Sequence, residues 1–552
     1  MSRRSLTPIV AILAVLALLA AACGDDGGDA LDRESVDSDP VDSATTTTVA
    51  DASTDTTTTT TEPPEPEPEA HTIGEPTPTP NPEISLPPDA GSAFYQGVGF
   101  DLSLVGYEQS EYFLSGTARS FSNTTELGSD GRWGVEPADE ADYTTRILVI
   151  RPSDEADFNG TVIVEWFNVT GGLDAAPNFT MSHVEQMREG YAYVGVSAQF
   201  RGIERSEGTI AIGFPIFLKG IQPERYESLS HPGDSFSYDI FSQAAQAVRE
   251  PMGIDPLGGL EIEQMIATGE SQSASRVATY VNAIDPVAQL FDGFMIHSRG
   301  RSSSGLSQDP QQEIGTPEVV FIRDDARVPV LAFQTEFDIL FGGALNRQDD
   351  SATYALWEVA GTSHGDTYSL PLDAGPQDLG NDPSVAEVRE IAEPIPGILE
   401  CGEPINSGPQ HYVLNAALQA LNRWVVDGDA PPPAPRIETV EAEVDPEFEG
   451  RQPSHHPVSD EFGNTLGGIR TAWVDVPVAQ LTGQPAAGSS FCPLFGTTTL
   501  FDDETLAELY PTKAVYLEAM TESIEQSVAD GFLLRPDANL ILENAASDRI
   551  GN

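Results

Sequence analysis

The sequence predicts an α/β fold in which helices cover both faces of a mostly parallel, eight-stranded sheet. Three observations indicate this fold. From residue 91 onward, apolar runs of strand length alternate with stretches of helical periodicity. A Gly-x-Ser turn joins one of these runs to a helical stretch, and an acidic residue and a histidine follow two later runs. Together they predict one large folded domain over residues 91–552.

The eight predicted strands and five predicted helices follow from these patterns. The strands are Glu111–Ala118, Arg146–Arg151, Thr161–Asn168, Ala192–Gln199, Gln264–Thr268, Asp292–His297, Val328–Thr335 and Ala355–Ala360. The helices are Met181–Glu189, Tyr238–Arg249, Ser273–Ala283, Gln410–Val426 and Thr505–Gly531. Two longer stretches, Arg201–Asp234 and Asp366–Pro409, exceed ordinary loop lengths. They are either lid-like insertions over the site or surface insertions.

Residues 1–22 have the layout of a signal peptide. Arg3 and Arg4 precede an apolar run that is too short for a good membrane span. The run ends in Ala-Ala-Ala-Cys23, which resembles a bacterial lipobox, so Cys23 is the expected lipidation site. An ordinary signal peptide with a coincidental cysteine is the alternative. The arginine pair leaves both the Sec and the twin-arginine export routes open.

Residues 23–90 are rich in Thr, Pro, Asp, Glu and Ser. This composition has too little apolar surface to offset the entropy of ordering, so it predicts a disordered, extended tether. The protein is therefore expected to be exported, as a membrane-anchored lipoprotein of the cell surface or as a secreted protein.

The formal net charge of −60 narrows the range of partners. Such a field repels nucleic acids and anionic lipid surfaces. Membrane contact is therefore expected only through the lipid anchor. The sequence predicts no oligomeric state.

Cys401 and Cys492 form an even pair once Cys23 is set aside. In an exported protein a disulfide between them is the expected state, and two buried thiols are the alternative. Neither cysteine has a second cysteine or a histidine at metal-ligand spacing, so no metal site is expected.

The segment from Met265 to Ala274 predicts a nucleophile elbow centred on Ser271. An apolar run ends at Thr268-Gly269, the serine follows, and a helical pattern begins near Ser273. A strained turn of this kind presents a serine hydroxyl above the sheet. The usual second glycine is replaced by Ser273, so the motif reads G-x-S-x-S.

An acid and a histidine follow in the chain order that α/β-hydrolases use, serine first, then acid, then histidine. The seventh predicted strand opens onto Asp338, and the eighth runs into His364. Glu336 is the alternative acid. Because the carboxyl ends of parallel strands share one edge, these residues are expected to meet there.

Each of these residue types has a role in acyl transfer. Ser271 needs a base to take its proton, His364 is the proposed base, and the acid fixes its tautomer. His297, at the end of the sixth predicted strand, is expected to line the pocket or to be structural. The predicted oxyanion hole combines the N–H of Gln272 with the loop carrying Thr170 and Gly171, for which an ordinary turn is the alternative.

Several segments resemble the bacterial "alpha/beta hydrolase domain-containing" family. They include Glu165–Ala175, Thr268–Ala274, Gln334–Asp338, Trp357–His364, Gly402–Gln410, Gly467–Trp473 and Phe491–Gly496. The resemblance covers essentially all of residues 91–552. It implies the α/β-hydrolase fold and a serine triad, and it includes Ser273 in the family's form of the elbow. It implies no particular substrate.

These observations predict an exported serine hydrolase that cleaves a small-molecule carboxylic ester through an acyl-enzyme, without a metal or organic cofactor. Two other functions remain open. A peptidase or lactonase would use the same triad, and a binding lipoprotein would use the fold without catalysis.

Overall fold

The computed structural model describes residues 73–204, 215–370, 377–394, 400–443, 454–488, 491–547 and 550. The expected signal peptide, Cys23 and the expected tether as far as residue 72 lie outside these ranges. The expected domain start at residue 91 lies inside them, and a short strand, β1 (Glu83–Ser85), precedes it. This strand pairs antiparallel with β2, so residues before 91 already belong to the sheet.

All eight predicted strands form, and with β1 they make one nine-stranded sheet in the order β1-β2-β3-β5-β4-β6-β7-β8-β9. Their bounds are β2 (Tyr107–Asn123), β3 (Val135–Pro152), β4 (Thr161–Trp166), β5 (Ala192–Val196), β6 (Gln264–Glu270), β7 (Gly293–His297), β8 (Val330–Thr335) and β9 (Tyr354–Val359). The strands β2 and β3 are much longer than predicted and pair as an antiparallel ribbon. From β5 to β9 every neighbouring pair is parallel, so the carboxyl ends of β4, β6, β7, β8 and β9 lie at one edge.

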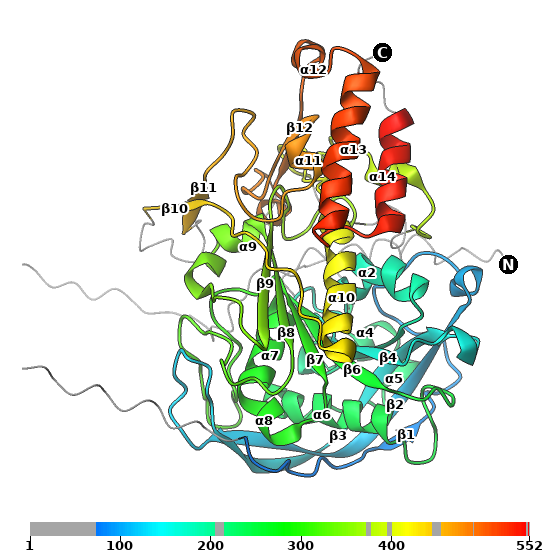
Figure 1. The fold of residues 1–552 in the computed structure, drawn as a ribbon. Coiled ribbons are helices and arrows are strands. Elements are labelled where there is room, and N and C mark those ends of the chain that lie inside the picture. The colour runs from blue at the N-terminus through cyan, green and yellow to red at the C-terminus, as the bar shows by residue number, and fades with distance from the viewer. Residues whose placement is uncertain are drawn as a thin grey trace, which may run out of the picture. The chain divides into compact units, whose positions relative to one another are not determined.

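Side chains alternate between the two faces of the central sheet along each strand, and both faces are buried. In β4, Val162 and Val164 belong to one apolar cluster, while Ile163 belongs to the other. The first cluster includes α6 (Ser237–Arg249) and α7 (Gln272–Thr279), and the second includes α2 (Pro177–Arg188) and α10 (Gln410–Asp427). Figure 1 shows α10 crossing one side of the sheet, with α7 and α6 around the strands. The helices therefore cover two faces, as predicted.

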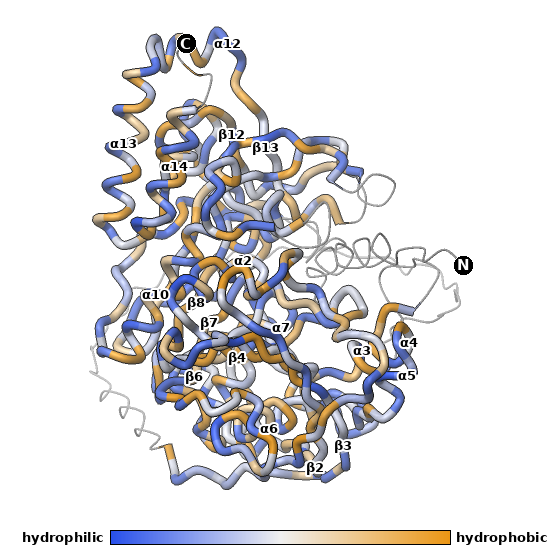
Figure 2. Tube along the Cα trace, turned by 90° about the vertical axis from the view of Figure 1, so that its right-hand side faces the viewer, coloured by the Kyte–Doolittle hydropathy of each residue, from blue (hydrophilic) through white to orange (hydrophobic). Residues whose placement is uncertain are grey.

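The prediction of one continuous helix over residues 505–531 is wrong. The chain forms two helices there, α12 (Asp503–Leu509) and α13 (Lys513–Ala529). Pro511 explains the break, since it lacks an N–H and moves the preceding residue out of the helical region; Tyr510 has ψ 75°. The following helix α14 (Arg535–Ser547) packs against α13. In Figure 2, α13 alternates between hydrophobic and hydrophilic residues along its length.

The predicted helix over 273–283 ends as α7 at Thr279 and continues as a π-helical segment, η4 (Tyr280–Ile284), and α8 (Asp285–Ala288). The shorter elements join these larger ones. They are η1 (Leu102–Val105), η2 (Glu155–Asp157), α3 (Phe200–Ile203), α4 (Leu218–Ile221), α5 (Pro223–Tyr226), η3 (Asp234–Phe236), α9 (Glu336–Leu340), η5 (Gly343–Asn346), η6 (Pro383–Ala386), β10 (Thr439–Glu441), β11 (His455–Pro457), α11 (Ala472–Asp475), β12 (Ala479–Thr482), η8 (Cys492–Phe495) and β13 (Thr497–Leu500).

The two predicted insertions fold onto neighbouring segments in their described parts. From the first, Ile203, Ile216 and Tyr226 pack in a cluster with Leu173. From the second, Leu370 and Ile405 pack with Phe337 and Phe495. A lid function for either insertion stays a prediction. Within the described ranges, no helix has both the length and the apolar composition needed to cross a membrane.

Candidate active site

Ser271 lies at a sharp turn between β6 and α7, with φ 58° and ψ −118°. Such a conformation costs a residue with a side chain about 1–3 kcal/mol, so the surrounding structure must hold it. The Ser271 N–H donates to the carbonyl of His297 at 2.9 Å. Gly269 permits the tight crossing, because a Cβ there would lie 2.7 Å from the backbone of Ser273.

Ser273 closes the turn from the other side. Its Oγ accepts the N–H of Glu270 at 3.0 Å and donates to the carbonyl of Glu270 at 2.8 Å. A glycine could make neither bond. The serine at the second glycine position is thus a clamp across the elbow, which accounts for the G-x-S-x-S form.

A continuous hydrogen-bond chain joins Ser271, His364 and Asp338. The Ser271 Oγ lies 3.0 Å from His364 Nε2, and His364 Nδ1 lies 2.7 Å from Asp338 Oδ1. Because the carboxylate is an acceptor, Nδ1 carries the proton and the lone pair of Nε2 faces the serine. This arrangement can draw a proton from the Ser271 hydroxyl.

Asp338 is held by the first turn of α9. Its Oδ2 accepts the N–H of Thr335 at 2.9 Å and the Thr335 hydroxyl at 2.7 Å, in a capping box. Burial opposes ionisation of Asp338, but the neighbouring His364 and these hydrogen bonds outweigh it and lower its pKa. Asp338 therefore faces His364 as a carboxylate.

Glu336, the alternative acid, does not contact His364. Its two carboxyl oxygens accept the N–H groups of Gly361 and Gly483, each at 2.9 Å. Burial raises the pKa of Glu336, while these backbone hydrogen bonds oppose the rise. Glu336 therefore ties the loop before His364 to a distant segment, and Asp338 is the one of the two predicted acids that contacts the imidazole.

The predicted oxyanion loop follows β4, and its two named residues differ in their backbone hydrogen bonds. The Thr170 N–H donates to Asn168 Oδ1 at 2.9 Å, so this N–H already has an acceptor within the loop. Gly171, the next residue, takes part in neither that bond nor the turn bond from Gly172 to Val169. The Gln272 N–H is the first of α7, and first-turn N–H groups have no intrahelical acceptor.

His297 is structural rather than reactive. Its Nδ1 donates to Asn178 Oδ1 at 3.2 Å, and its Nε2 accepts from the Gln410 amide at 3.0 Å. Burial lowers the pKa of His297 to about 3, so the ring is neutral. It links β7 to α2 and α10.

Glu270, the residue before Ser271, is a site residue that the sequence reasoning missed. Its side chain is buried, and its Oε1 lies 3.2 Å from His364 Nε2. Burial raises the pKa of Glu270 to about 8, while the adjacent His364 lowers it in part. The available signal in the sequence was an acid directly before the nucleophile, after the apolar residues Met265, Ile266 and Ala267.

The predicted disulfide between Cys401 and Cys492 is confirmed. Shortly after Cys492, the Leu494 carbonyl accepts the Ser363 hydroxyl at 2.7 Å and the Gly365 N–H at 3.2 Å. These two donors flank His364 in the chain. The disulfide therefore braces the segment on which the histidine loop rests.

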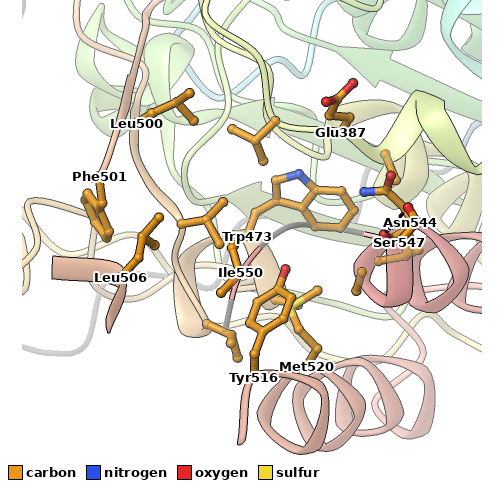
Figure 3. Close-up of a pocket in the computed structure, with 17 residues that line it drawn as sticks. Glu387, Trp473, Leu500, Phe501, Leu506, Tyr516, Met520, Asn544, Ser547 and Ile550 are labelled. Carbon is orange, nitrogen blue, oxygen red and sulfur yellow. Dashed lines mark hydrogen bonds between the residues drawn. The ribbon is translucent and has the colours of Figure 1, made fainter. Parts of the chain in front are cut away.

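Two cavities of the structure lie away from these residues. A cavity of about 460 Å³ lies among the C-terminal elements, where Trp473, Tyr516 and Met520 form its apolar wall (Figure 3). Ser271 and His364 are only 7 % and 8 % exposed and line neither this cavity nor a second one of about 320 Å³ beside His183. Among the residues that the structure describes, no cluster of His, Cys, Asp or Glu side chains is placed to bind a metal ion.

Comparisons with known proteins give one family match and several distant structural similarities. Residues 75–543 match the family described as "Alpha/beta hydrolase domain". No curated protein matches significantly. Similar solved structures include a fungal esterase from Rhizomucor miehei, with 13 % identity and a TM-score of 0.24 over 46 % of this chain and 78 % of that chain. A putative dienelactone hydrolase from Klebsiella pneumoniae has 12 % identity and a TM-score of 0.23 over 48 % of this chain and 93 % of that chain.

Acetyl xylan esterase 1 from Thermoanaerobacterium has 12 % identity and a TM-score of 0.26 over 50 % of this chain and 81 % of that chain. Similarities this low carry no argument about this chain. The family match spans most of the sequence, and the parallel sheet with its turn between β6 and α7 agrees with it. The chain therefore belongs to the alpha/beta hydrolase domain family and has the α/β-hydrolase fold.

Proposed function

We propose that the protein is an exported serine hydrolase that cleaves a small, uncharged carboxylic ester through an acyl-enzyme. The observation that carries this proposal is the chain of hydrogen bonds from Ser271 Oγ through His364 to Asp338, built on the strained turn after β6. A serine placed this way has a base for its proton and a fixed direction of attack.

The reaction has two halves. In the first, Ser271 Oγ bonds to the ester carbonyl carbon while its proton moves to His364 Nε2, and that proton then passes to the departing alcohol. In the second, a water molecule gives its proton to His364 and attacks the acyl-enzyme, and Ser271 recovers the proton as the acid leaves. The N–H groups of Gly171 and Gln272 are the proposed donors to the carbonyl oxygen in both halves.

Charge supports an uncharged substrate. The chain carries a formal charge of −60. An anionic ester would meet a repulsive field on approach. Small neutral acyl esters avoid this cost.

The test is a substrate panel with the purified mature protein. Neutral acyl esters of several chain lengths, aryl esters, lactones and peptides are compared for wild type and Ser271→Ala. We expect ester turnover that the substitution abolishes. Turnover of lactones or peptides alone would assign the same residues to a different reaction, and a folded wild type that hydrolyses none of them would refute the proposal.

Export and anchoring form a separate part of the proposal, based on residues 1–23. Mass spectrometry of the mature amino terminus is expected to find Cys23 carrying acyl chains. A mature terminus elsewhere, without lipid, would reject the anchor and leave the esterase proposal intact.

A further inference from the structure

Glu270 faces the reacting nitrogen of His364. It is the last residue of β6, its side chain is buried, and its Oε1 lies 3.2 Å from His364 Nε2. The Ser271 hydroxyl lies 3.0 Å from the same nitrogen. A neutral imidazole nitrogen has one lone pair, so the serine and a protonated Glu270 compete for it.

Asn168 determines which oxygen of Glu270 meets the histidine. Its Nδ2 donates to Glu270 Oε2 at 3.3 Å and to the Glu270 carbonyl at 3.1 Å, while its Oδ1 accepts the Thr170 N–H. Because Oε2 already accepts a hydrogen bond, a proton on neutral Glu270 belongs on Oε1, opposite His364 Nε2. The geometry therefore places a titratable O–H on the base itself.

The titratable groups around Glu270 come from β4, α9, β7 and the loop after β9. Glu165 on β4 and Asp338 on α9 are acids and disfavour a further negative charge, and His364 favours it. His297 on the neighbouring strand β7 is neutral. Burial has the largest effect and raises the pKa of Glu270 to about 8, so Glu270 exchanges its proton in the range where an esterase works.

We propose that Glu270 is a further catalytic residue, one that controls when His364 can accept the proton of Ser271. This inference rests on the proposed serine-hydrolase function. With Glu270 protonated, its O–H donates to His364 Nε2 and occupies the lone pair that the serine needs. With Glu270 ionised, the lone pair is available.

In the ionised state, the proton moves from Ser271 Oγ to His364 Nε2 as the Oγ–carbon bond forms. The resulting imidazolium N–H lies beside the Glu270 carboxylate, which stabilises the positive charge. The proton then passes to the leaving alcohol, and Glu270 remains a carboxylate throughout. No net proton is gained or lost by Glu270 in a cycle.

The signature of this role is a shift in the dependence of rate on pH. A negative Glu270 raises the pH at which the Glu270–His364 pair releases its last proton. Replacing it by glutamine removes that charge. In Glu270→Gln, Asn168 holds the amide oxygen at the Oε2 position, so the amide N–H faces His364 Nε2 and occupies its lone pair as protonated Glu270 does. We therefore expect the acid limb of kcat/KM to move down by about one pH unit or more in this variant, while the plateau kcat falls by about a hundredfold or more.

The experiment measures p-nitrophenyl acetate hydrolysis by the full mature protein from pH 5 to 10. It compares wild type with Glu270→Gln and with Glu263→Gln, which removes an equal charge from an exposed residue just before β6. Fluorophosphonate labelling gives the fraction of intact sites, and thermal melting reports folding. The control variant is expected to follow the wild-type profile.

A folded Glu270→Gln variant with the wild-type limb and plateau would overturn the proposal. If Glu270→Gln fails to fold, Glu270→Asp decides, because its shorter carboxylate still titrates but lies farther from Nε2. An acid limb between those expected for wild type and the glutamine variant supports the role, and an unshifted limb with full kcat overturns it. A wild type that hydrolyses no ester would instead refute the proposed function.

Discussion

Replacing Asp338 by asparagine tests how the acid orients His364. Asp338 Oδ2 accepts two hydrogen bonds from Thr335, so the single oxygen of an asparagine must stay in that position. The amide nitrogen then takes the place of Oδ1 and donates to His364 Nδ1, where the aspartate accepts at 2.7 Å. The imidazole proton is forced onto Nε2, which can no longer accept the proton of Ser271.

The expected loss is large because the wrong tautomer removes the base rather than weakening it. In enzymes with a Ser-His-Asp triad, this change lowers kcat by about 10⁴-fold, which is roughly 5.4 kcal/mol of transition-state stabilisation. The fold should be little affected, since the asparagine keeps both hydrogen bonds from Thr335.

The assay is steady-state hydrolysis of p-nitrophenyl acetate, with melting temperature as the folding control. Glu336→Gln is the matched variant, because it removes one buried carboxylate two residues away that binds Gly361 and Gly483 instead of the histidine. We expect it to lower stability and to reduce kcat by less than about tenfold. If Asp338→Asn kept more than a tenth of the wild-type kcat, the assignment of Asp338 as the orienting acid would be refuted.

Three further predictions concern stability. Arg146→Met leaves the buried acids Glu111 and Asp174 without their shared cation. It should lower the free energy of unfolding, measured by urea titration, by about 3–5 kcal/mol, and a loss under about 1 kcal/mol would contradict this. Replacing Cys401 and Cys492 together by serine removes a disulfide that joins residues 91 positions apart. It should lower the free energy of unfolding by about 4–5 kcal/mol, and a variant with the melting temperature of the oxidised wild type would contradict this. Burial raises the pKa of Glu165 to about 8, so the folded state holds its proton more tightly than the unfolded chain does. That stabilisation is complete below about pH 4.5 and is lost as the pH rises through 8, so the free energy of unfolding should fall over this range, and less steeply in Glu165→Gln; parallel profiles would exclude this effect.

Much of the fold was predictable because buried parallel strands are continuous apolar runs, as in Val328–Thr335. The missed strand β1 lies among prolines, in a stretch whose composition matches the tether, and it is defined only by pairing with β2. The outer parts of β2 and β3 carry exposed acids such as Glu136 and Glu140, so no apolar run marked them. The break at Pro511 was readable from the sequence, since proline disfavours a helical residue before it.

Proximity of Ser271, Asp338 and His364 followed from chain order and from strands that end at one edge. The choice between Asp338 and Glu336 did not, because both lie on the first turn of α9 and only the direction of that turn separates them. The contacts of Glu270 and Thr170 could not be predicted either. They depend on the direction of the Glu270 side chain and of the Thr170 N–H, each within a tight turn. Such directions arise from contacts distant in sequence, such as the bond from Asn168 to Glu270.

The most direct test of the central claim is to locate the nucleophile chemically. The mature protein is treated with a fluorophosphonate, digested and analysed by peptide mass spectrometry. We expect one adduct, on Ser271, and its loss in His364→Ala, because the serine is unreactive without its base. A folded wild type that stays unlabelled, or one labelled on Ser273 or another serine instead, would contradict the account.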